Sequence, residues 1–279
     1  MIDYDKYESK EELFDFLVSN KKSLIMQKKS ALKQAEAVSC FVPIIKDNGE
    51  EIKASPKTAV DLIKQDSIRV KAVINTTKLA DSHRDVHMDG TFKQSTKQQK
   101  QMLHLQEHES KFDKIISDSA RPFLKSMKWS DIGYDFKGET EAFCFDSEIK
   151  ADRNPFMFEQ YAKGYVKNHS VGMQYITLFI CLNEERYPAE KANWDKYYPE
   201  VANKDVVDSW GMFWAVTEAK AIEGSAVVRG SNYATPTISV KENIEEPAAA
   251  TPKENTEAAV NLDTVDKETF RNLLKNITK

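Results

Sequence analysis

The chain has 279 residues, of which 41% are hydrophobic, 10% aromatic and 30% charged. This balance excludes a wholly disordered polymer and a membrane protein, and the length leaves room for one large domain or two small ones. With 40 basic and 44 acidic residues the formal net charge is -4, which argues against nucleic acid as the main partner.

The three cysteines, Cys40, Cys144 and Cys181, are widely spaced. This spacing fits neither a disulfide framework nor a zinc site, and it favours a reducing compartment. The acidic N-terminus lacks the apolar segment of a signal peptide, and no apolar run approaches the length of a membrane span. We therefore expect a cytoplasmic protein.

The N-terminal segment, residues 1–37, is predicted to be a helical extension. Ser9 and Glu12 have the spacing of a capping box just before an apolar run, so a short helix should begin there. A second, lysine-rich helix is expected within residues 21–36. Its lysines could bind an acidic partner, but a solvated helix face is the favoured interpretation.

Residues 38–240 are predicted to form an α+β domain with a mostly antiparallel β-barrel or sheet core and flanking helices. The strand candidates are residues 38–45, 68–74, 101–106, 112–117, 141–149, 169–182, 211–218 and 220–228. Two helical stretches interrupt them. One begins at Asn154 and Pro155, an N-cap and first-turn pair, and the other covers residues 188–198, which could also form a long aromatic loop.

The remaining chain changes character. Residues 241–262 are rich in acidic residues, proline and alanine and are predicted to be a linker. In residues 263–279 the apolar side chains recur at helical spacing, which predicts an amphipathic C-terminal helix. A helix of this length is marginal alone in water, so it should dock onto a partner or back onto the core.

Two segments resemble a phosphate-binding and a metal-binding motif but lack required features of each. Residues 133–139 have the outer spacing of a phosphate loop but lack its lysine, and a turn between two strands explains both glycines. His83 and His87 would be a metal-binding pair if they lay on a helix. Turn-forming residues surround them and the glutamate of the helical zinc motif is missing, so a loop is favoured.

Ser170 is the candidate nucleophile. Its surroundings are one residue short of the G-x-S-x-G elbow of α/β-hydrolases, but that fold needs a histidine after the serine, and none follows His169. Strand alternation turns the imidazole of His169 away from Ser170, so His104 and His108 are the candidate bases. Gly172 shares a face with Ser170 and would leave room for a substrate backbone. From the residues alone, an ordinary strand serine is the favoured interpretation, and the nucleophile is the alternative.

Four short motifs follow one another in a characteristic order between about residues 68 and 235. The matching residues are Asp81, Asp85, Gly90 and Phe92 in an Asp-rich loop, Leu105 and His108 in a Leu-x-x-His strand end, Gly164 and residues 170–173 after a helix, and Glu223, Ser225 and Asn232 in the last strand. In this order and spacing the chain resembles the tailed-phage prohead maturation proteases, serine endopeptidases distantly related to the herpesvirus assemblins. Met173 replaces the usual aromatic residue, and residues 183–210 look like an insertion.

The resemblance implies an assemblin-like fold and assigns the candidate roles. Ser170 would attack the scissile carbonyl, His108 would act as base, and Glu223 would orient the imidazole. Backbone N–H groups, with the Arg229–Gly230 segment contributing, would form the oxyanion hole. The alternatives that stay open are His104 as base and Asp113, Asp146 or Glu148 as the third member.

The expected substrates are the scaffold, the N-terminal segment of the major capsid protein, and the enzyme itself, inside the procapsid in the host cytoplasm. No metal, cofactor, nucleic acid or membrane is expected. The C-terminal helix would be a removable tail, a tether or a site of self-association. The alternatives are a catalytically inactive scaffold or internal capsid-assembly protein of the same fold, and an unrelated β-rich binding module.

Overall fold

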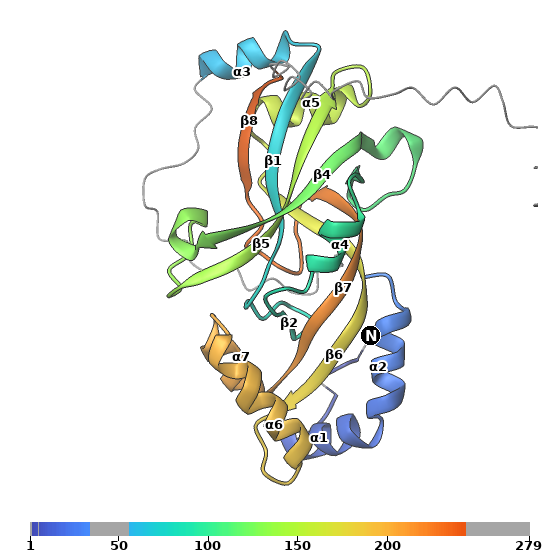
Figure 1. Ribbon diagram of the computed structural model, residues 1–279, viewed down its shortest axis with the longest axis vertical. Helices are drawn as coiled ribbons and strands as arrows, with labels where there is room; N and C mark the ends of the chain where they lie inside the picture. The colour runs from blue at the N-terminus through green and yellow to red at the C-terminus, as the bar shows by residue number, and fades with distance from the viewer. Residues whose placement is uncertain (1, 5, 34–55, 244–279) are drawn as a thin grey trace, which may run out of the picture. The chain divides into compact units, whose positions relative to one another are not determined.

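A computed structural model describes residues 2–4, 6–33 and 56–243, which belong to one compact unit that ends at Asn243 (Figure 1). Three predicted features lie outside the described residues: the strand at residues 38–45, all but the first residues of the linker at 241–262, and the C-terminal helix at 263–279. Within the described part of the chain, no helix is long and apolar enough to cross a membrane.

The fold is α+β, as predicted, with a mixed and mostly antiparallel sheet. Its strands are β1 (Ser67–Thr76), β2 (Asp85–His87), β3 (Met102–Gln106), β4 (Ile115–Lys128), β5 (Glu139–Lys150), β6 (Asn168–Leu182), β7 (Met212–Val227) and β8 (Thr237–Glu242). They follow the order β2-β7-β3-β4-β5-β1-β8, and β6 pairs with β7. Only the β2–β7 and β3–β7 pairs are parallel. The sheet is open, so the barrel considered from the sequence does not close.

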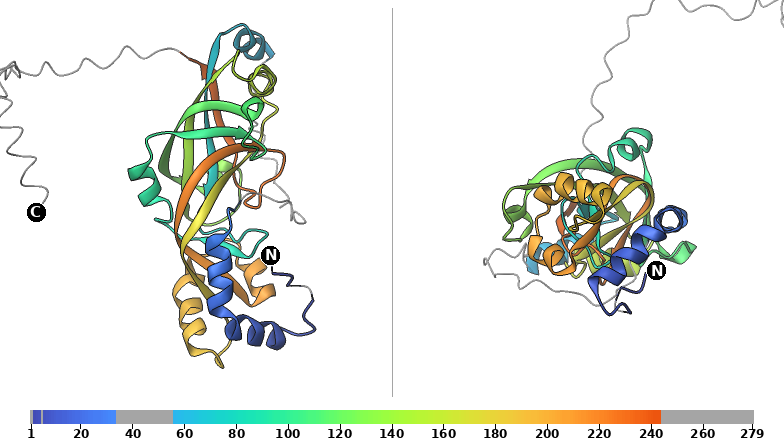
Figure 2. Two further views of the ribbon diagram at one scale, coloured as in Figure 1. Left: turned by 90° about the vertical axis from the view of Figure 1, so that its right-hand side faces the viewer. Right: turned by 90° about the horizontal axis from the view of Figure 1, so that it is seen from below.

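Helices flank the sheet (Figures 1 and 2). They are α1 (Lys10–Ser19), α2 (Lys21–Ser30), α3 (Pro56–Ile63), α4 (Lys93–Gln98), α5 (Pro155–Ala162), α6 (Pro188–Tyr197) and α7 (Lys204–Trp210). The helix start predicted at α1 is confirmed, with Ser9 as its N-cap: Ser9 Oγ accepts from Glu12 N at 3.1 Å, while Glu12 Oε2 reaches back to Glu8 N, one residue before the cap, at 3.0 Å. Asn154 caps α5 through Met157 N at 3.1 Å.

The second N-terminal helix is shorter than predicted. It ends at Ser30, and Ala31 is already extended. The chain then forms an antiparallel bridge between Lys33 and Met173 of β6. Helical periodicity alone did not locate this end, because the lysine spacing continues through the point where the backbone leaves the helix.

Strand β7 corrects the prediction of two strands at residues 211–218 and 220–228, since it is one strand with β-bulges. Gly172 of β6 pairs with Glu223 and Met173 pairs with Ala221, which leaves Ile222 as an extra residue. The bulge shifts the alternation, so that Ala221 points into the core while Glu223 points to the opposite face. The sequence pattern lost its period at this point and therefore resembled a break between strands.

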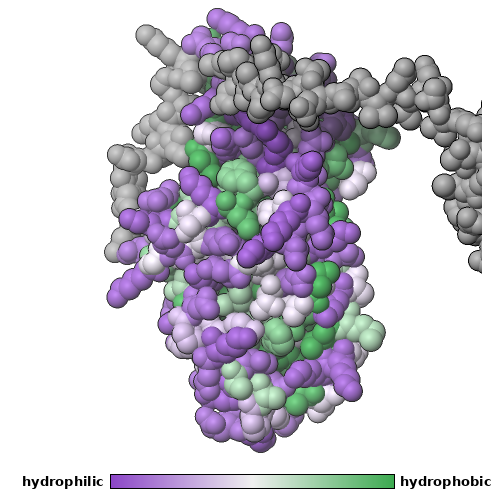
Figure 3. Space-filling model, in the orientation of Figure 1, coloured by the Kyte–Doolittle hydropathy of each residue, from purple (hydrophilic) through white to green (hydrophobic). Residues whose placement is uncertain are grey.

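The core lies between the inner faces of the bent sheet and beneath the N-terminal helices. Phe92 stacks on Phe143 with ring centroids 4.4 Å apart, and both are fully buried. Leu17 of α1 is also fully buried and belongs to the same apolar cluster, so the N-terminal helices are an integral part of this unit. Most of the surface seen in Figure 3 is hydrophilic, with smaller apolar patches.

Candidate active site

The candidate site begins with two facing pairs on adjacent antiparallel strands. Ser170 of β6 lies directly opposite Ser225 of β7, and Gly172 lies opposite Glu223. Directly opposed residues point to the same face, with Cβ atoms about 5 Å apart. Ser170, Ser225 and Glu223 therefore project from one face of the β6–β7 pair.

His108 meets Glu223 on this face. The imidazole Nδ1 lies 2.6 Å from Glu223 Oε1, and the exposed fractions of the two residues are only 8% and 3%. A carboxylate that accepts from Nδ1–H fixes the tautomer in which Nε2 carries the lone pair. This is the arrangement a histidine needs to act as a general base through Nε2.

Ser225 ties the two partners together. Its hydroxyl donates to Glu223 Oε2 at 2.6 Å and accepts from His108 N at 3.2 Å. Both carboxylate oxygens of Glu223 are thus engaged, one by the imidazole and one by a hydroxyl. Because Ser225 is fully buried and its proton is committed to Glu223, it acts here as a positioning residue.

The backbone that presents His108 is in a sparsely populated conformation. Glu107 and His108 have φ values of 52° and 59°, successive left-handed residues at the end of β3. Non-glycine residues rarely adopt this region, and the strain persists only where surrounding contacts hold it. Here Glu107 N donates to Ala226 O at 2.9 Å, and Glu107 Oε1 accepts from Val228 N at 2.8 Å.

Gly172 has a role different from the one expected. The sequence suggested that it leaves room for a substrate backbone. A β-carbon at this position would lie 2.1 Å from Glu223 Oε1, so the missing side chain makes room for the carboxylate that binds His108. The expectation was wrong because the cross-strand neighbour of Gly172 depends on a register that the sequence did not reveal.

The Arg229–Gly230 segment passes close to Ser170. A β-carbon at Gly230 would lie 3.8 Å from Ser170 Cβ and 3.1 Å from His169 O. Ser170 is itself 8% exposed and lines a small pocket together with Asn232 and residues from the Asp-rich loop. A backbone this close to the serine is suitably placed to supply N–H groups to a bound carbonyl.

His104, the alternate base, lies in a different environment. Its Nδ1 is 3.0 Å from Ser147 Oγ and its Nε2 is 2.9 Å from Tyr161 OH, and the ring is fully buried. Tyr161 OH also lies 2.8 Å from His169 Nε2. Burial lowers the pKa of His104 well below its usual value and lowers that of His169 to about 4. Both histidines are therefore neutral core groups at physiological pH.

The competing carboxylates have other partners. Asp146 accepts from Arg69 Nε at 2.7 Å, and Glu148 accepts from Asn243 Nδ2 at 3.0 Å. The Asp113 side chain is 75% exposed and lies 4.0 Å from Lys114. Glu223 is the carboxylate that contacts His108 Nδ1.

The Asp-rich loop holds a short strand where the sequence predicted only a loop. His87 ends β2 and is fully buried, with Nδ1 3.4 Å from Asn75 Nδ2 and Nε2 3.3 Å from Tyr175 OH. Asp81 Oδ1 accepts from the backbone N–H groups of His83 and Asp85 at 2.8 and 3.0 Å. His83 and His87 thus lie in different local structures, on a turn and on a strand.

The sequence analysis assigned no function to Ser225, and it favoured a solvated helix face for the lysines of residues 21–36, which is wrong for Lys28 because its side chain is buried against Asp85. The Glu-x-Ser spacing, which puts both side chains on one face of a strand, was the available signal for Ser225. Lys28 and Lys33 gave no such signal, because their contact with Asp85 depends on long-range packing.

Searches of protein families, curated proteins and solved structures find no match to this chain.

Proposed function

We propose that the chain is a serine endopeptidase of the prohead maturation type, with an assemblin-like catalytic arrangement. The observation that carries the proposal is the buried contact of 2.6 Å between His108 Nδ1 and Glu223, on the strand face from which Ser170 also projects. A serine, and a carboxylate from the same strand face that holds an imidazole, can supply the three roles of a catalytic triad. The resemblance in motif order adds the substrate class.

In this reaction Ser170 Oγ attacks the scissile carbonyl carbon while His108 Nε2 takes the hydroxyl proton. Glu223 keeps Nδ1 protonated and stabilises the imidazolium that forms. Backbone N–H groups of the segment around Gly230 stabilise the oxyanion. His108 then gives its proton to the leaving amine, and a water molecule, activated by the same imidazole, hydrolyses the acyl-enzyme.

The proposed substrates are protein segments within an immature capsid: scaffold, the N-terminal part of the major capsid protein, and the chain itself. These partners rest on the resemblance. For this reaction the proposed nucleophile, base and orienting carboxylate all come from this chain. Inside a procapsid the enzyme would meet its substrates at very high local concentration.

The test is co-expression of the full chain with its cognate capsid and scaffold proteins. Ser170→Ala and His108→Ala should abolish processing, whereas Ser126→Ala, which removes an exposed strand serine, should leave it unchanged. Intact-mass spectrometry of assembled particles reads out each cleavage. Identical processing in all four chains would overturn the proposal, and absence of processing in the unaltered chain would favour an inactive assembly protein of the same fold.

A further inference from the structure

The edge of β6 that faces away from β7 already holds a segment of extended chain. Lys33 N donates to Met173 O at 2.8 Å, and Met173 N donates to Lys33 O at 3.0 Å. The two residues form an antiparallel bridge. We call residues 21–33, which comprise α2 and this extended end, the N-terminal arm. Its last residue, Lys33, pairs with β6 through this bridge.

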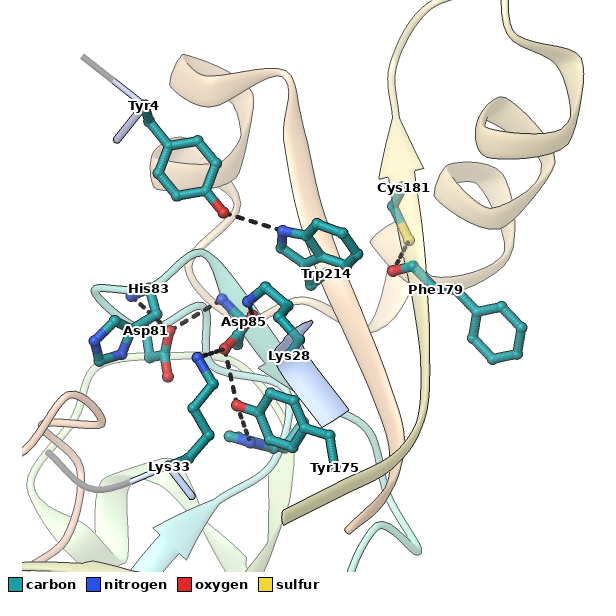
Figure 4. Close-up of polar contacts among 11 residues, drawn as sticks. Tyr4, Lys28, Lys33, Asp81, His83, Asp85, Tyr175, Phe179, Cys181 and Trp214 are labelled. Atoms are coloured by element: carbon teal, nitrogen blue, oxygen red, sulfur yellow. Dashed lines mark hydrogen bonds and ion pairs between the residues drawn. The ribbon is translucent and has the colours of Figure 1, made fainter. Parts of the chain in front are cut away.

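The side chains of the arm converge on one buried carboxylate (Figure 4). Asp85 is completely buried and forms an ion pair with Lys28 Nζ, while Lys33 Nζ lies 3.7 Å from its Oδ2. Tyr175 OH donates to the same Oδ2 at 2.8 Å. Burial alone would raise the pKa of Asp85, but the two lysines lower it to about 2. Asp85 is therefore a fixed negative charge compensated by cations from the arm.

This contact lies beside the candidate nucleophile. Lys33, Met173 and Ser170 line the same pocket, and Asp81 lies on its wall. Because the bridge is antiparallel, the chain at Lys33 is directed along β6 from Met173 toward Ser170. A peptide entering this edge in the same way would be directed toward Ser170.

Strand addition is a general mode of peptide recognition. The main chain provides affinity through hydrogen bonds to a free sheet edge, and pockets for individual side chains provide specificity. Here the main-chain contact is at Met173, and the lysine side chains of the arm reach the buried carboxylate of Asp85. A buried carboxylate in such a pocket selects a cationic side chain, because leaving it unpaired is strongly unfavourable.

We propose, building on the protease function above, that the edge of β6 at Met173 and the Asp85 carboxylate form the binding site for an extended substrate segment that carries a lysine. The N-terminal arm occupies this site in cis as a pseudosubstrate. A substrate protein then binds only after the extended end of the arm at Lys33 has left the edge.

Binding can be tested without turnover in the full chain carrying Ser170→Ala. The probe is a fluorescein-labelled peptide with the sequence of residues 28–39, followed by anisotropy. The double substitution Lys28→Glu and Lys33→Glu puts negative charge next to Asp85 and should release the arm, so that the probe binds at least tenfold more tightly than to the Ser170→Ala parent. The matched control is Lys22→Glu with Lys29→Glu, which makes the same charge change at two exposed positions of α2.

A second variant guards against loss of folding. Lys33→Pro removes the N–H that donates to Met173 but leaves Lys28 to compensate Asp85, and it should also admit the probe. Circular dichroism checks each chain. Equal probe binding by the parent and both release variants would overturn the proposal, as would equal binding of a probe with alanine in place of Lys33. Because no cleavage is involved, these results are independent of whether Ser170 is a nucleophile.

Discussion

His104 and His108 lie four residues apart on one short stretch of chain, yet their surroundings give them opposite properties. His104 points into the core, where a serine and a tyrosine hydroxyl hold both of its ring nitrogens. His108 points to the other face, past the end of β3, and meets a carboxylate. Hydroxyl groups contact both ring nitrogens of His104, whereas the carboxylate at His108 Nδ1 keeps Nε2 as the proton-accepting atom of the ring and stabilises the imidazolium that forms when a proton is taken up.

The surroundings of each ring decide which of the two histidines is suited to act as a base. Residue type and burial do not distinguish them, because both are histidines and both rings are largely buried. The distinction depends on which strand face each ring occupies and on what the neighbouring strand β7 presents there. Gly224 lies opposite His104, whereas Glu223 and Ser225 serve the other face.

The largest expected effect comes from exchanging the histidines for glutamine one at a time. His108→Gln should lower the cleavage rate by about 10⁴-fold, because the proton acceptor is lost. His104→Gln should retain cleavage and instead lower the free energy of unfolding by about 1–3 kcal/mol, as expected for a disturbed buried hydrogen-bond pair. Single-turnover cleavage and urea unfolding measure the two effects. Comparable loss of cleavage in both variants would contradict the assignment.

A smaller loss is expected when Glu223 is altered. Glu223→Gln should slow cleavage by about 10³-fold, because an amide can favour the wrong imidazole tautomer. Gly172→Ala should act on the same contact, since its β-carbon would displace the carboxylate.

The link between Gly172 and Glu223 can be tested with Glu223→Asp, which shortens the side chain, made both in the parent and in the Gly172→Ala background. Aspartate should lose less activity in the Gly172→Ala background than in the parent, because the shorter carboxylate relieves the clash. Strictly additive losses would mean that Gly172 acts independently of Glu223.

Because the core histidines are buried as neutral groups, we expect the free energy of unfolding to fall in acid. Burial lowers the folded-state pKa of His169 to about 4, below its unfolded value, so the unfolded chain binds a proton first as the pH falls. The stabilisation is complete above pH ~6.5 and is lost progressively toward pH ~4. Between pH 7 and 5 this group should cost about 2 kcal/mol. Denaturant unfolding of the parent and of His169→Gln checks it: the variant should show a shallower pH dependence, and an unchanged slope would contradict the assignment.

The smallest effect is expected at Ser225. Ser225→Ala removes one hydrogen bond from Glu223 and one from the His108 backbone, while the contact between imidazole and carboxylate remains. Cleavage should fall by about tenfold, the effect of about 1.4 kcal/mol in the barrier. The pH profile of the rate should shift as well, because Glu223 loses a donor. A rate loss as large as that of His108→Gln would instead mean that Ser225 takes a direct part in the reaction.

Much of the fold could be predicted from local pattern. The Ser9 cap of α1, the Asn154 cap of α5 and the long apolar runs of β5 and β6 all carry their signal in a few neighbouring residues. The short strand β2, the helices α4 and α7 and the end of α2 did not, because packing with distant segments determines them. In α4 (Lys93–Gln98), for example, apolar residues do not recur at helical spacing, and the one buried side chain of this helix donates a hydrogen bond to β7.

At the candidate site, the local sequence pattern indicated the residue types and the strand face that each residue occupies. The contacts between these residues depend on the register of the paired strands. Ser170 and Gly172 on one face of a strand followed from alternation. That Gly172 leaves room for Glu223, and that Ser225 holds both partners, depends on how β6 and β7 align. The same holds for Asp85, whose cations come from the N-terminal arm, more than fifty positions away in the chain.

Because Ile222 is an extra residue in the pairing of β6 with β7, the number of residues in this part of β7 matters more than which side chain stands at position 222. Ile222 is 37% exposed, so many side chains could replace it. Deleting it would turn every following residue of the strand to the opposite face, sending Glu223 and Ser225 toward Phe145 and bringing Gly224 and Ala226 to His108. A shift of the frame by one residue would thus exchange the polar and apolar sides of the strand.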